Sequence, residues 1–581
     1  MAAYDERPWL ASYPAEVPHD YDFPDVPLTR FLDDAADSFP TSLAISFLGT
    51  TMTYAQLRAD VDRFAGALEA LGVTKGDRVA LVLPNCPQNV IAFYAILRLG
   101  AVVVQHNPLY TPHEMGHQLA DCGAKVVITL DRAHATVLEA KPQTAIEQVI
   151  VTSIIDYLPR RQQLLLRLPI SKAKTKRAEI SAVVPKDAQR FSDLLAGSPG
   201  PAKQADLEPS TDLALLQYTG GTTGLSKGAM LTHANLVANA YQCRLWFTGA
   251  KAGQERTLAV LPLFHAYGLT LCLGLTVLLA GNLILLPRFD LELTFEAIDK
   301  WRPTLFPGVP PIYKAMVDSP DVGKHDLRSI KECVSGAMKL PVEVAASFEQ
   351  ITGGRLVEGY GMTEASPVTH ANPLTGTRRS GMIGIPIPGT LARVVDQEDP
   401  AIPMPIGEPG ELVISGPQVM QGYWNAKDSA DAFAETFTSE GFLRTGDIAV
   451  MDADGWFNVV DRKKELIIAG GFNIYPSEVE EVLYTMVGIA DVVVVGVPDA
   501  YRGETVKAYI VQQPGAMLTE ADVKAYCGER LTPYKVPKLV EFRETLPRTM
   551  VGKVLRRVLV AEEREKQAAA ATVSARESDG G

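Results

Sequence analysis

Hydrophobic and polar positions alternate along this chain in two distinct patterns. Short apolar runs, rich in β-branched residues, are followed by amphipathic stretches of helical length. The apolar runs lie at 79–83, 101–105, 126–130, 258–261, 283–286 and 356–358, and the clearest helical stretches at 90–99 and 112–119. Because strands that alternate with covering helices pair into parallel sheets, the pattern predicts an α/β fold rather than a sandwich or a helical bundle.

The pattern changes near residue 384. Short strands and turn sequences fill 384–460, which predicts a mostly antiparallel β subdomain. After 461 a compact α+β pattern begins, with helices expected at 479–487 and 520–530 and strands at 490–497, 506–512 and 539–542. We therefore expect a large N-terminal domain over 1–460, a hinge at 461–465, a small mobile α+β C-terminal domain over 466–567, and a disordered Ala/Ser/Gly-rich tail at 568–581.

Length and composition narrow the class of protein. A chain of 581 residues exceeds what one hydrophobic core supports, so two or three domains are expected. The net charge of −13 argues against nucleic acid as a bulk partner. The six cysteines form no C-x-x-C pair, so neither a zinc ribbon nor a disulfide framework is indicated. The polar N-terminus lacks a signal sequence, which predicts a cytoplasmic protein.

Two segments bear on membrane contact. Residues 257–287 contain no Asp, Glu, Lys or Arg, but Pro262, Gly268 and Gly281 interrupt the run. These breaks leave roughly 14 residues of helix where a bilayer requires about 20, so we expect a buried core helix followed by a strand. Residues 153–179 are instead basic and interleaved with leucines. Such a run is usually a solvated helix face; the alternative is weak contact with the inner, anionic face of a membrane.

The segment 218–233 carries the most specific chemistry. Glycines and hydroxyl residues surround Lys227, between an apolar run at 213–217 and an amphipathic run that begins near 234. Glycine allows successive backbone amides to face an anion, and hydroxyls and a lysine complete a polyphosphate site. Since Lys227 follows Ser226 and precedes Gly228, the Walker pattern G-x-x-x-x-G-K-[ST] does not fit. We predict a phosphate loop of a different type.

Further motifs follow in a fixed order, at 358–364, 445–447, 461–465, 468–476 and 547–553. Together with the phosphate loop they resemble the adenylate-forming superfamily of acyl-CoA synthetases, luciferases and peptide-synthetase adenylation domains. The resemblance covers residues 25–560. Within that superfamily, the runs at 107–112, 441–452 and 534–542 are most similar to bacterial long-chain fatty acid–CoA ligases.

The resemblance implies a two-step reaction with ATP, Mg²⁺ and CoA. A carboxylate is a poor electrophile, so ATP first converts it to an acyl-adenylate with loss of pyrophosphate, and the CoA thiol then displaces AMP. The first step concentrates negative charge on phosphate oxygens, and each donor or cation placed there is worth about 10²–10³ in rate. The implied substrates are a fatty acid, ATP and CoA.

The resemblance also assigns residues to the phosphates and the metal. The phosphate-binding set is Thr219, Gly220, Gly221, Thr222, Thr223, Gly224 and Lys227. Thr222 and Glu364 would bind Mg²⁺, which prefers hydroxyl, carboxylate and phosphate oxygens. Thr363 would contact the α-phosphate. Lys553 would bridge the substrate carboxylate and the α-phosphate in the first step only.

The nucleoside and the acyl group have their own implied residues. Tyr360 would stack on adenine, and the residues expected around the base are Gly336, Ala337, Glu358, Gly359 and Gly361. Asp447, which we expect to be exposed, would accept from the ribose hydroxyls with Arg462 nearby. His265, in an apolar run, is interpreted as a positioning residue beside the substrate carboxylate and not as a general base.

Resemblance further implies two arrangements of the C-terminal domain, one for each step. The pivot would lie at Asp461 and Lys464, and Gly470 and Gly471 would line the pantetheine path, since residues without Cβ let a thin chain pass. Domain closure would exclude water from the adenylate. No insertion separates Lys464 from Tyr475, which favours a complete CoA ligase over an enzyme that stops at the adenylate.

Several alternatives stay open at this stage. His113, Glu114 and His117 match the zinc-protease pattern H-E-x-x-H, for which Glu139 has suitable chemistry as a third ligand. A non-catalytic protein that binds acyl or nucleotide ligands is a second alternative. Within the ligase chemistry, a medium-chain or aryl acid could replace the long-chain substrate. A homodimer is compatible with the sequence.

Overall fold

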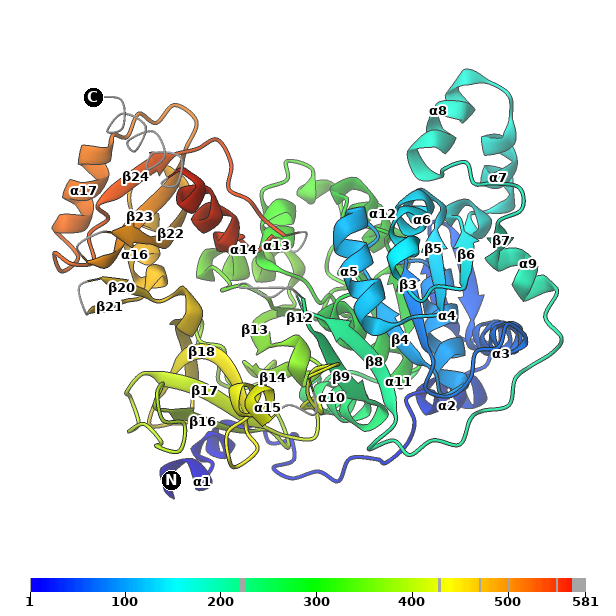
Figure 1. Ribbon diagram of the computed structural model, residues 1–581, viewed down its shortest axis with the longest axis horizontal. Coiled ribbons are helices and arrows are strands. Elements are labelled where there is room, and N and C mark those ends of the chain that lie inside the picture. Colours follow the sequence, from blue (N-terminus) through cyan, green and yellow to red (C-terminus); the bar gives the residue numbers. More distant parts are fainter. Residues whose placement is uncertain are drawn as a thin grey trace, which may run out of the picture.

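The computed structural model describes residues 2–219, 226–426, 430–469, 472–499, 502–549 and 552–566. A large body of sheets and helices fills the right and centre of Figure 1, and a smaller body, which contains the C-terminal strands and helices, lies at its upper left. The expected tail at 568–581 lies outside the described residues.

A seven-stranded sheet organises the first half of the large domain. Its order is β7-β6-β5-β3-β4-β8-β9, parallel except for the antiparallel pair β8–β9. The strands are β3 (Arg78–Val82), β4 (Val102–Gln105), β5 (Val126–Leu130), β6 (Gln148–Thr152), β7 (Gln189–Arg190), β8 (Leu213–Tyr218) and β9 (Gly228–Thr232). Val79 and Leu81 join the core that includes helix α4 (Pro87–Arg98), whereas Ala80 and Val82 join the core that includes α5 (Pro112–Cys122). Burial on both faces explains the unbroken apolar runs in the sequence.

A second group of strands completes the large domain. The order β10-β11-β1-β2 is joined to β12-β13-β14-β15 through bridges that Leu305 makes to Thr257 and Glu332. The bounds are β1 (Leu43–Phe47), β2 (Thr50–Thr53), β10 (Arg256–Ala259), β11 (Asn282–Leu285), β12 (Glu332–Ser335), β13 (Arg355–Gly361), β14 (Val368–Ala371) and β15 (Ile385–Pro386). The pairs β1–β2, β13–β14 and β14–β15 are antiparallel and the remaining pairs within the two sheets are parallel. The expected α/β fold is therefore confirmed, with sheets that are partly mixed.

The charge-free segment 257–287 is buried core, but its helix differs from the expectation. A π-helix at Gly268–Gly274 continues directly into α11 (Leu275–Leu278), so the regular helix is shorter than roughly 14 residues. Apolar spacing alone does not distinguish a π turn from an α turn, and π segments are frequent near functional sites. No helix among the described residues is long and apolar enough to cross a membrane.

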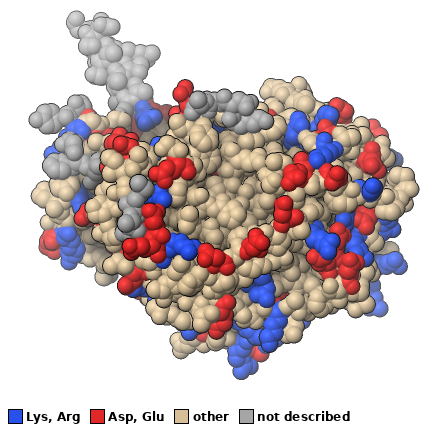
Figure 2. All heavy atoms as spheres, turned by 90° about the horizontal axis from the view of Figure 1, so that it is seen from below, with Lys and Arg blue, Asp and Glu red and all other residues tan. Residues whose placement is uncertain are grey.

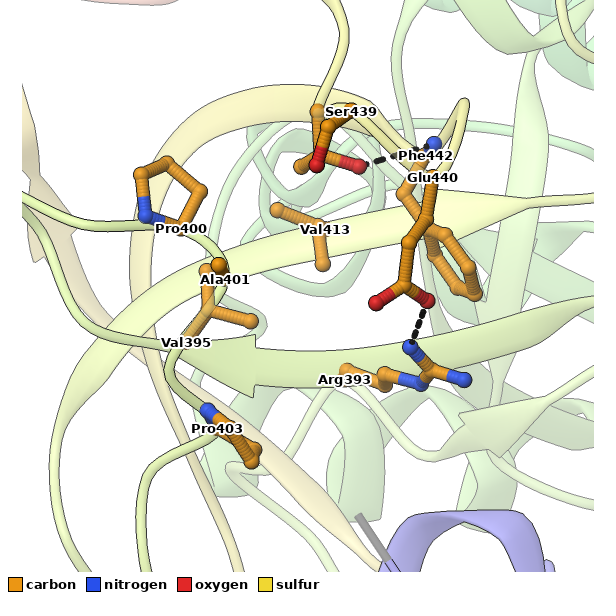
Figure 3. Close-up of a pocket in the computed structure, with 10 residues that line it drawn as sticks. Arg393, Val395, Pro400, Ala401, Pro403, Val413, Ser439, Glu440 and Phe442 are labelled. Carbon is orange, nitrogen blue, oxygen red and sulfur yellow. Dashed lines mark hydrogen bonds and ion pairs between the residues drawn. The ribbon is translucent and has the colours of Figure 1, made fainter.

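An antiparallel sheet follows, as predicted for 384–460. Its strands are β16 (Leu391–Val395), β17 (Gly410–Ser415), β18 (Leu443–Met451) and β19 (Phe457–Arg462), paired in sequence order. A cavity of about 10 Å³ lies against this sheet, where Arg393 sits 4.4 Å above the Phe442 ring and pairs with Glu440 (Figure 3). A space of this size holds at most one water molecule, so it belongs to the packing and not to a ligand site.

The C-terminal domain has its own small core. Strands β20 (Ile467–Ala469), β21 (Phe472–Ile474), β22 (Ile489–Asp499), β23 (Gly503–Gln512) and β24 (Leu539–Phe542) form one sheet, covered by α16 (Pro476–Tyr484) and α17 (Glu520–Gly528). This is the predicted α+β unit. Lys339 of the large domain pairs with Glu481 of α16 at 2.5 Å, and a Cβ on Gly552 would lie 3.0 Å from Pro311. The two domains therefore touch beside the segment that carries Lys553.

The basic segment 153–179 forms a helical hairpin at the edge of the molecule. Helices α7 (Arg160–Arg167) and α8 (Ser171–Ile180) lie at the upper right of Figure 1, beyond strands β6 and β7. On the face seen in Figure 2, by contrast, acidic and basic side chains are interspersed around an uncharged central area.

Candidate active site

The end of strand β13 and the hairpin β18–β19 bring three predicted nucleotide residues together. The Tyr360 hydroxyl donates to Asp447 Oδ2 at 2.5 Å, and Arg462 Nε lies 3.1 Å from Asp447 Oδ1. The hairpin register places Asp447 directly opposite Arg462. Our expectation of an exposed Asp447 is wrong, because its side chain is only 6% exposed beneath these two partners. A buried carboxylate with a fixed orientation is better suited to select one pair of hydroxyls.

Glu364 is a buried carboxylate that a tyrosine connects to Lys227 of the phosphate loop. It is 7% exposed, and burial raises its pKa. The Tyr423 hydroxyl donates to Glu364 Oε1 at 2.7 Å, while Lys227 Nζ lies 5.2 Å from the centre of the Tyr423 ring. Tyr423 thus links the metal-binding candidate to the loop lysine. Tyr423 was not among the predicted site residues, because nothing in its local sequence indicates a partner 59 residues earlier in the chain.

The residues that flank the phosphate loop are held together. Thr219 N donates to the Lys227 carbonyl at 3.0 Å, where strands β8 and β9 meet. Lys227 itself is exposed. The predicted ligands Gly220, Gly221, Thr222, Thr223 and Gly224 lie outside the described residues.

Glu358 and Gly359, two of the residues expected around adenine, lie within strand β13. The Glu358 carboxylate accepts from Leu340 N at 3.2 Å and from Gly381 N at 2.7 Å, so it fixes the backbone at both positions. A Cβ on Gly359 would lie 2.7 Å from Val334 Cγ1.

Close contacts explain two further glycines expected around adenine. A Cβ on Gly336 would lie 3.0 Å from the Tyr267 ring, and one on Gly361 only 2.0 Å from the Pro367 carbonyl. Ala337 is exposed and has φ of 67°, a left-handed conformation that non-glycine residues adopt at some cost. Thr363 begins the short helix that carries Glu364.

Lys553 reaches this site from the C-terminal domain. Burial, together with the charges of Arg462 and Arg556, lowers the pKa of Lys553 to about 8 against the opposing effect of Glu465 and Asp447. Lys553 N donates to Thr549 Oγ1 at 3.1 Å, within a tight turn of the C-terminal segment. The β18–β19 hairpin supplies two residues of this set: Asp447, the predicted ribose ligand, and Arg462, which was expected near it. Charged residues of both domains therefore interact at this site.

His265 has the properties of a neutral positioning group. It lies beside Phe264 with ring centres 4.8 Å apart, and burial lowers its pKa to about 4. The imidazole is therefore uncharged near pH 7.

The predicted hinge residues occupy different environments. Asp461 is buried and accepts from Ser477 N and Ser477 Oγ, each at 2.9 Å, at the beginning of α16. It thereby joins the last strand of the antiparallel sheet to the C-terminal domain. Lys464 is exposed. Gly470 and Gly471 lie outside the described residues.

The H-E-x-x-H pattern has a structural explanation. Glu114 forms a capping box with Thr111 at the start of α5, accepting from Thr111 N at 3.0 Å. His113 and Glu139 are exposed, and the described residues contain no group of three or more potential metal ligands from His, Cys, Asp and Glu.

Comparison with known proteins decides the family. The profile of AMP-binding enzymes matches residues 32–424, and that of the AMP-binding enzyme C-terminal domain matches 478–553. The chain belongs to the AMP-binding enzyme family. The resemblance to adenylate-forming enzymes is thereby confirmed, and the zinc-protease alternative is dropped because His113–His117 lies inside the match.

Relatives of this AMP-binding enzyme cover almost its whole length. A long-chain-fatty-acid–CoA ligase of Bacillus subtilis (strain 168) is 46% identical, covering 96% of this chain and 99% of the relative. A feruloyl-CoA synthase of Amycolatopsis sp is 37% identical, covering 89% and 95%. ATP-bound MatB from Rhodopseudomonas palustris has a TM-score of 0.78 at 30% identity, covering 92% of this chain and 99% of that chain.

Proposed function

We propose that the protein is an ATP-dependent fatty acid–CoA ligase that forms acyl-CoA, AMP and pyrophosphate. The observation that carries this proposal is the convergence of Lys553, from the C-terminal domain, with Asp447 and Arg462 of the large domain. A lone nucleotide-binding protein has no need of a cation delivered by a second domain. A cation at this point can neutralise both the substrate carboxylate and the α-phosphate while the acyl-adenylate forms.

The chain's residues then divide the work of the first step. Asp447 accepts from the ribose hydroxyls, and Tyr360, whose hydroxyl is fixed by Asp447, offers its ring to adenine. Thr363 and the phosphate-loop residues bind phosphate oxygens, while Lys553 stabilises the charge that develops as the carboxylate oxygen attacks. Neutral His265 orients the carboxylate and takes no proton.

We assign Glu364 and Thr222 to Mg²⁺. The donor set fits, because a buried carboxylate whose pKa burial raises is stabilised as an anion by a divalent cation, and Mg²⁺ prefers oxygen ligands. When bound, Mg²⁺ supplies positive charge to the phosphates. Tyr423 holds Glu364 in place and Lys227 adds a second cation beside it.

We further propose that the C-terminal domain alternates about Asp461 and Lys464. The Lys339–Glu481 pair, 61% and 62% exposed, stabilises the arrangement described here only weakly, as is usual for surface ion pairs. The domain can therefore leave after the first step and expose the adenylate to CoA, with Gly470 and Gly471 along the path.

A long-chain fatty acid is the proposed substrate. The 46% identity to a long-chain-fatty-acid–CoA ligase over nearly the whole chain supports it. A medium-chain or aryl acid is the second candidate, favoured by the 37% identity to a feruloyl-CoA synthase.

The products test the reaction class directly. Incubation with MgATP, CoA and palmitate should yield acyl-CoA, AMP and pyrophosphate in equal amounts, measured by chromatography. ADP and inorganic phosphate as products would contradict an adenylate mechanism.

The pH dependence should report the charge on Lys553. Its pKa of about 8 means that the cation predominates below that value and is lost as pH rises through it. We expect kcat/KM for ATP in the adenylation half-reaction to fall above pH 8. Lys553→Arg should be slower but should lose this alkaline limb, since arginine stays charged. An identical alkaline limb in both enzymes would contradict the assignment.

We propose a cytoplasmic enzyme that binds weakly to the inner face of the membrane through the α7–α8 hairpin. Leu164, Leu165 and Ile170 are 63%, 59% and 55% exposed. Exposed cations surround them: Arg160, Arg161, Arg167, Lys172, Lys174, Lys176 and Arg177. Apolar side chains among cations fit a surface of anionic lipids, where each cation contributes about 1 kcal/mol.

Vesicle binding tests the hairpin. The protein should sediment with phosphatidylglycerol vesicles at low salt but not with phosphatidylcholine vesicles. Exchange of Arg160, Arg161, Lys172 and Lys174 for glutamine should lower anionic-vesicle affinity at least 10-fold. The matched control is Val487→Ser with Met517→Ser, two side chains 89% and 91% exposed elsewhere, which should change nothing. Equal losses in the two variants would refute the proposal. Light scattering of the same samples separates a monomer from the homodimer that the sequence allows.

A further inference from the structure

We infer that helix α5, through Gln118 and Asp121, clamps both ends of the phosphate loop, and that Gln118 is a positioning residue for ATP. Helix α5 is the segment that carries the H-E-x-x-H pattern, which the proposed function leaves unused. The inference rests on the proposed function in one respect, the assignment of residues 219–227 to ATP phosphates.

The first contact lies where the chain enters the loop. Tyr218 ends strand β8, and its hydroxyl donates to Asp121 Oδ2 at 2.5 Å. Asp121 Oδ1 also accepts from Asn425 Nδ2 at 2.9 Å. The last residue of the strand is thereby tied to the C-terminal turn of α5.

The second contact lies where the chain leaves the loop. Gln118 Nε2 donates to Ser226 Oγ at 3.1 Å, directly before Lys227. Gln118 is only 4% exposed, so its amide has little freedom to turn towards water. One turn of helix therefore binds both ends of the loop, since Gln118 and Asp121 are three residues apart and share a face.

His106 orients the Gln118 amide. Its Nδ1 lies 2.8 Å from Gln118 Oε1, and its ring stacks on Tyr218 with centres 6.0 Å apart. Burial lowers the pKa of His106 to about 4, so the ring carries one proton near pH 7. Since an amide oxygen only accepts, that proton lies on Nδ1, and the amide nitrogen of Gln118 is left to face Ser226. His106 Nε2 is buried without a hydrogen-bond partner among the described side chains.

The clamp affects ATP binding and not the second half-reaction. Loop ends that are fixed in advance reduce the ordering that a ligand must impose when it binds. A single neutral hydrogen bond is typically worth about a 5-fold change in an equilibrium constant. Loss of the Gln118–Ser226 bond should therefore raise KM for ATP about 3- to 10-fold and leave KM for the acid unchanged.

Substitutions at both partners test the contact. Ser226→Ala removes the acceptor without disturbing His106, and Ser226→Thr keeps the hydroxyl and should restore KM for ATP. Gln118→Leu should resemble Ser226→Ala, and the double variant should be no worse than the more damaged single variant. His113→Ala, an exposed residue of the same helix, is the matched control and should equal the wild type. Thioester formation from preformed acyl-adenylate should be unchanged throughout.

Two results would overturn the inference. One is an unchanged KM for ATP in Ser226→Ala; the other is additive losses in the double variant. Equilibrium binding of ATP alone, measured by dialysis, distinguishes failure of the clamp from failure of the proposed function. A wild type that binds ATP but makes no acyl-CoA would refute the function, and the clamp would then be decided by the ATP affinities of the same variants.

Discussion

Replacement of Lys553 by alanine should lower the rate of adenylate formation about 10²–10³-fold, while thioester formation from preformed acyl-adenylate stays close to wild type. The reason is positional. Lys553 is the group from the C-terminal domain that lies among Asp447, Arg462 and Glu465 in the arrangement described here. Its ammonium stabilises the negative charge that develops on the phosphate oxygens only while the α-phosphate is being attacked. Once the adenylate has formed, this charge has left with pyrophosphate.

The two half-reactions can be measured separately. Pyrophosphate–ATP exchange with fatty acid reports the first, and CoA consumption with synthetic acyl-adenylate reports the second. Lys538→Ala, which removes an exposed lysine from the same domain, is the matched control and should leave both rates unchanged. Equal losses in both half-reactions of Lys553→Ala would contradict a domain that serves the two steps in different arrangements.

Glu364→Gln should produce the second large effect, a loss of about 10²-fold in adenylation at low Mg²⁺ that higher Mg²⁺ partly restores. The amide keeps the size of the side chain and can still accept from the Tyr423 hydroxyl, so the packing changes little. It removes the negative charge that a divalent cation requires.

Glu358→Gln provides the contrast. Glu358 is similarly buried, but its carboxylate accepts from the backbone of Leu340 and Gly381. Its loss should lower thermal stability and raise KM for ATP, without a change in the Mg²⁺ concentration for half-maximal rate. A Mg²⁺ dependence of Glu364→Gln equal to that of the wild type would remove Glu364 from the metal site.

Much of the fold is readable from hydrophobic periodicity. The strands around 79–83, 101–105 and 126–130 are buried on both faces, so their sequence is continuously apolar, and their expected bounds differ from the structure by one residue or less. The turn-rich texture of 384–460 likewise predicts the antiparallel sheet. The π-helix at Gly268–Gly274 could not be predicted, since the same leucine-rich spacing suits a buried α-helix.

Fewer of the site's contacts than of the fold's elements can be predicted from the sequence. Residues within ordered motifs, such as Tyr360, Glu364 and Lys553, can be found because each motif is short and distinctive. Partners that come from distant segments cannot be found in this way. Tyr423 reaches Glu364 across 59 residues, and Gln118 reaches Ser226 across 108. Asp447 illustrates the same point, because its burial depends on Tyr360, 87 residues earlier in the chain, and on Arg462 of the paired strand β19.

The proposed ligase activity is tested by measuring acyl-CoA formation with MgATP and CoA across carboxylic acids from acetate to oleate, together with coumarate. We expect turnover that requires CoA and is greatest with palmitate or oleate. If the rate is highest with coumarate or a medium-chain acid, the proposed mechanism stands but the proposed long-chain substrate is wrong. If the protein binds ATP but forms no acyl-CoA from any acid, the proposed ligase activity is wrong.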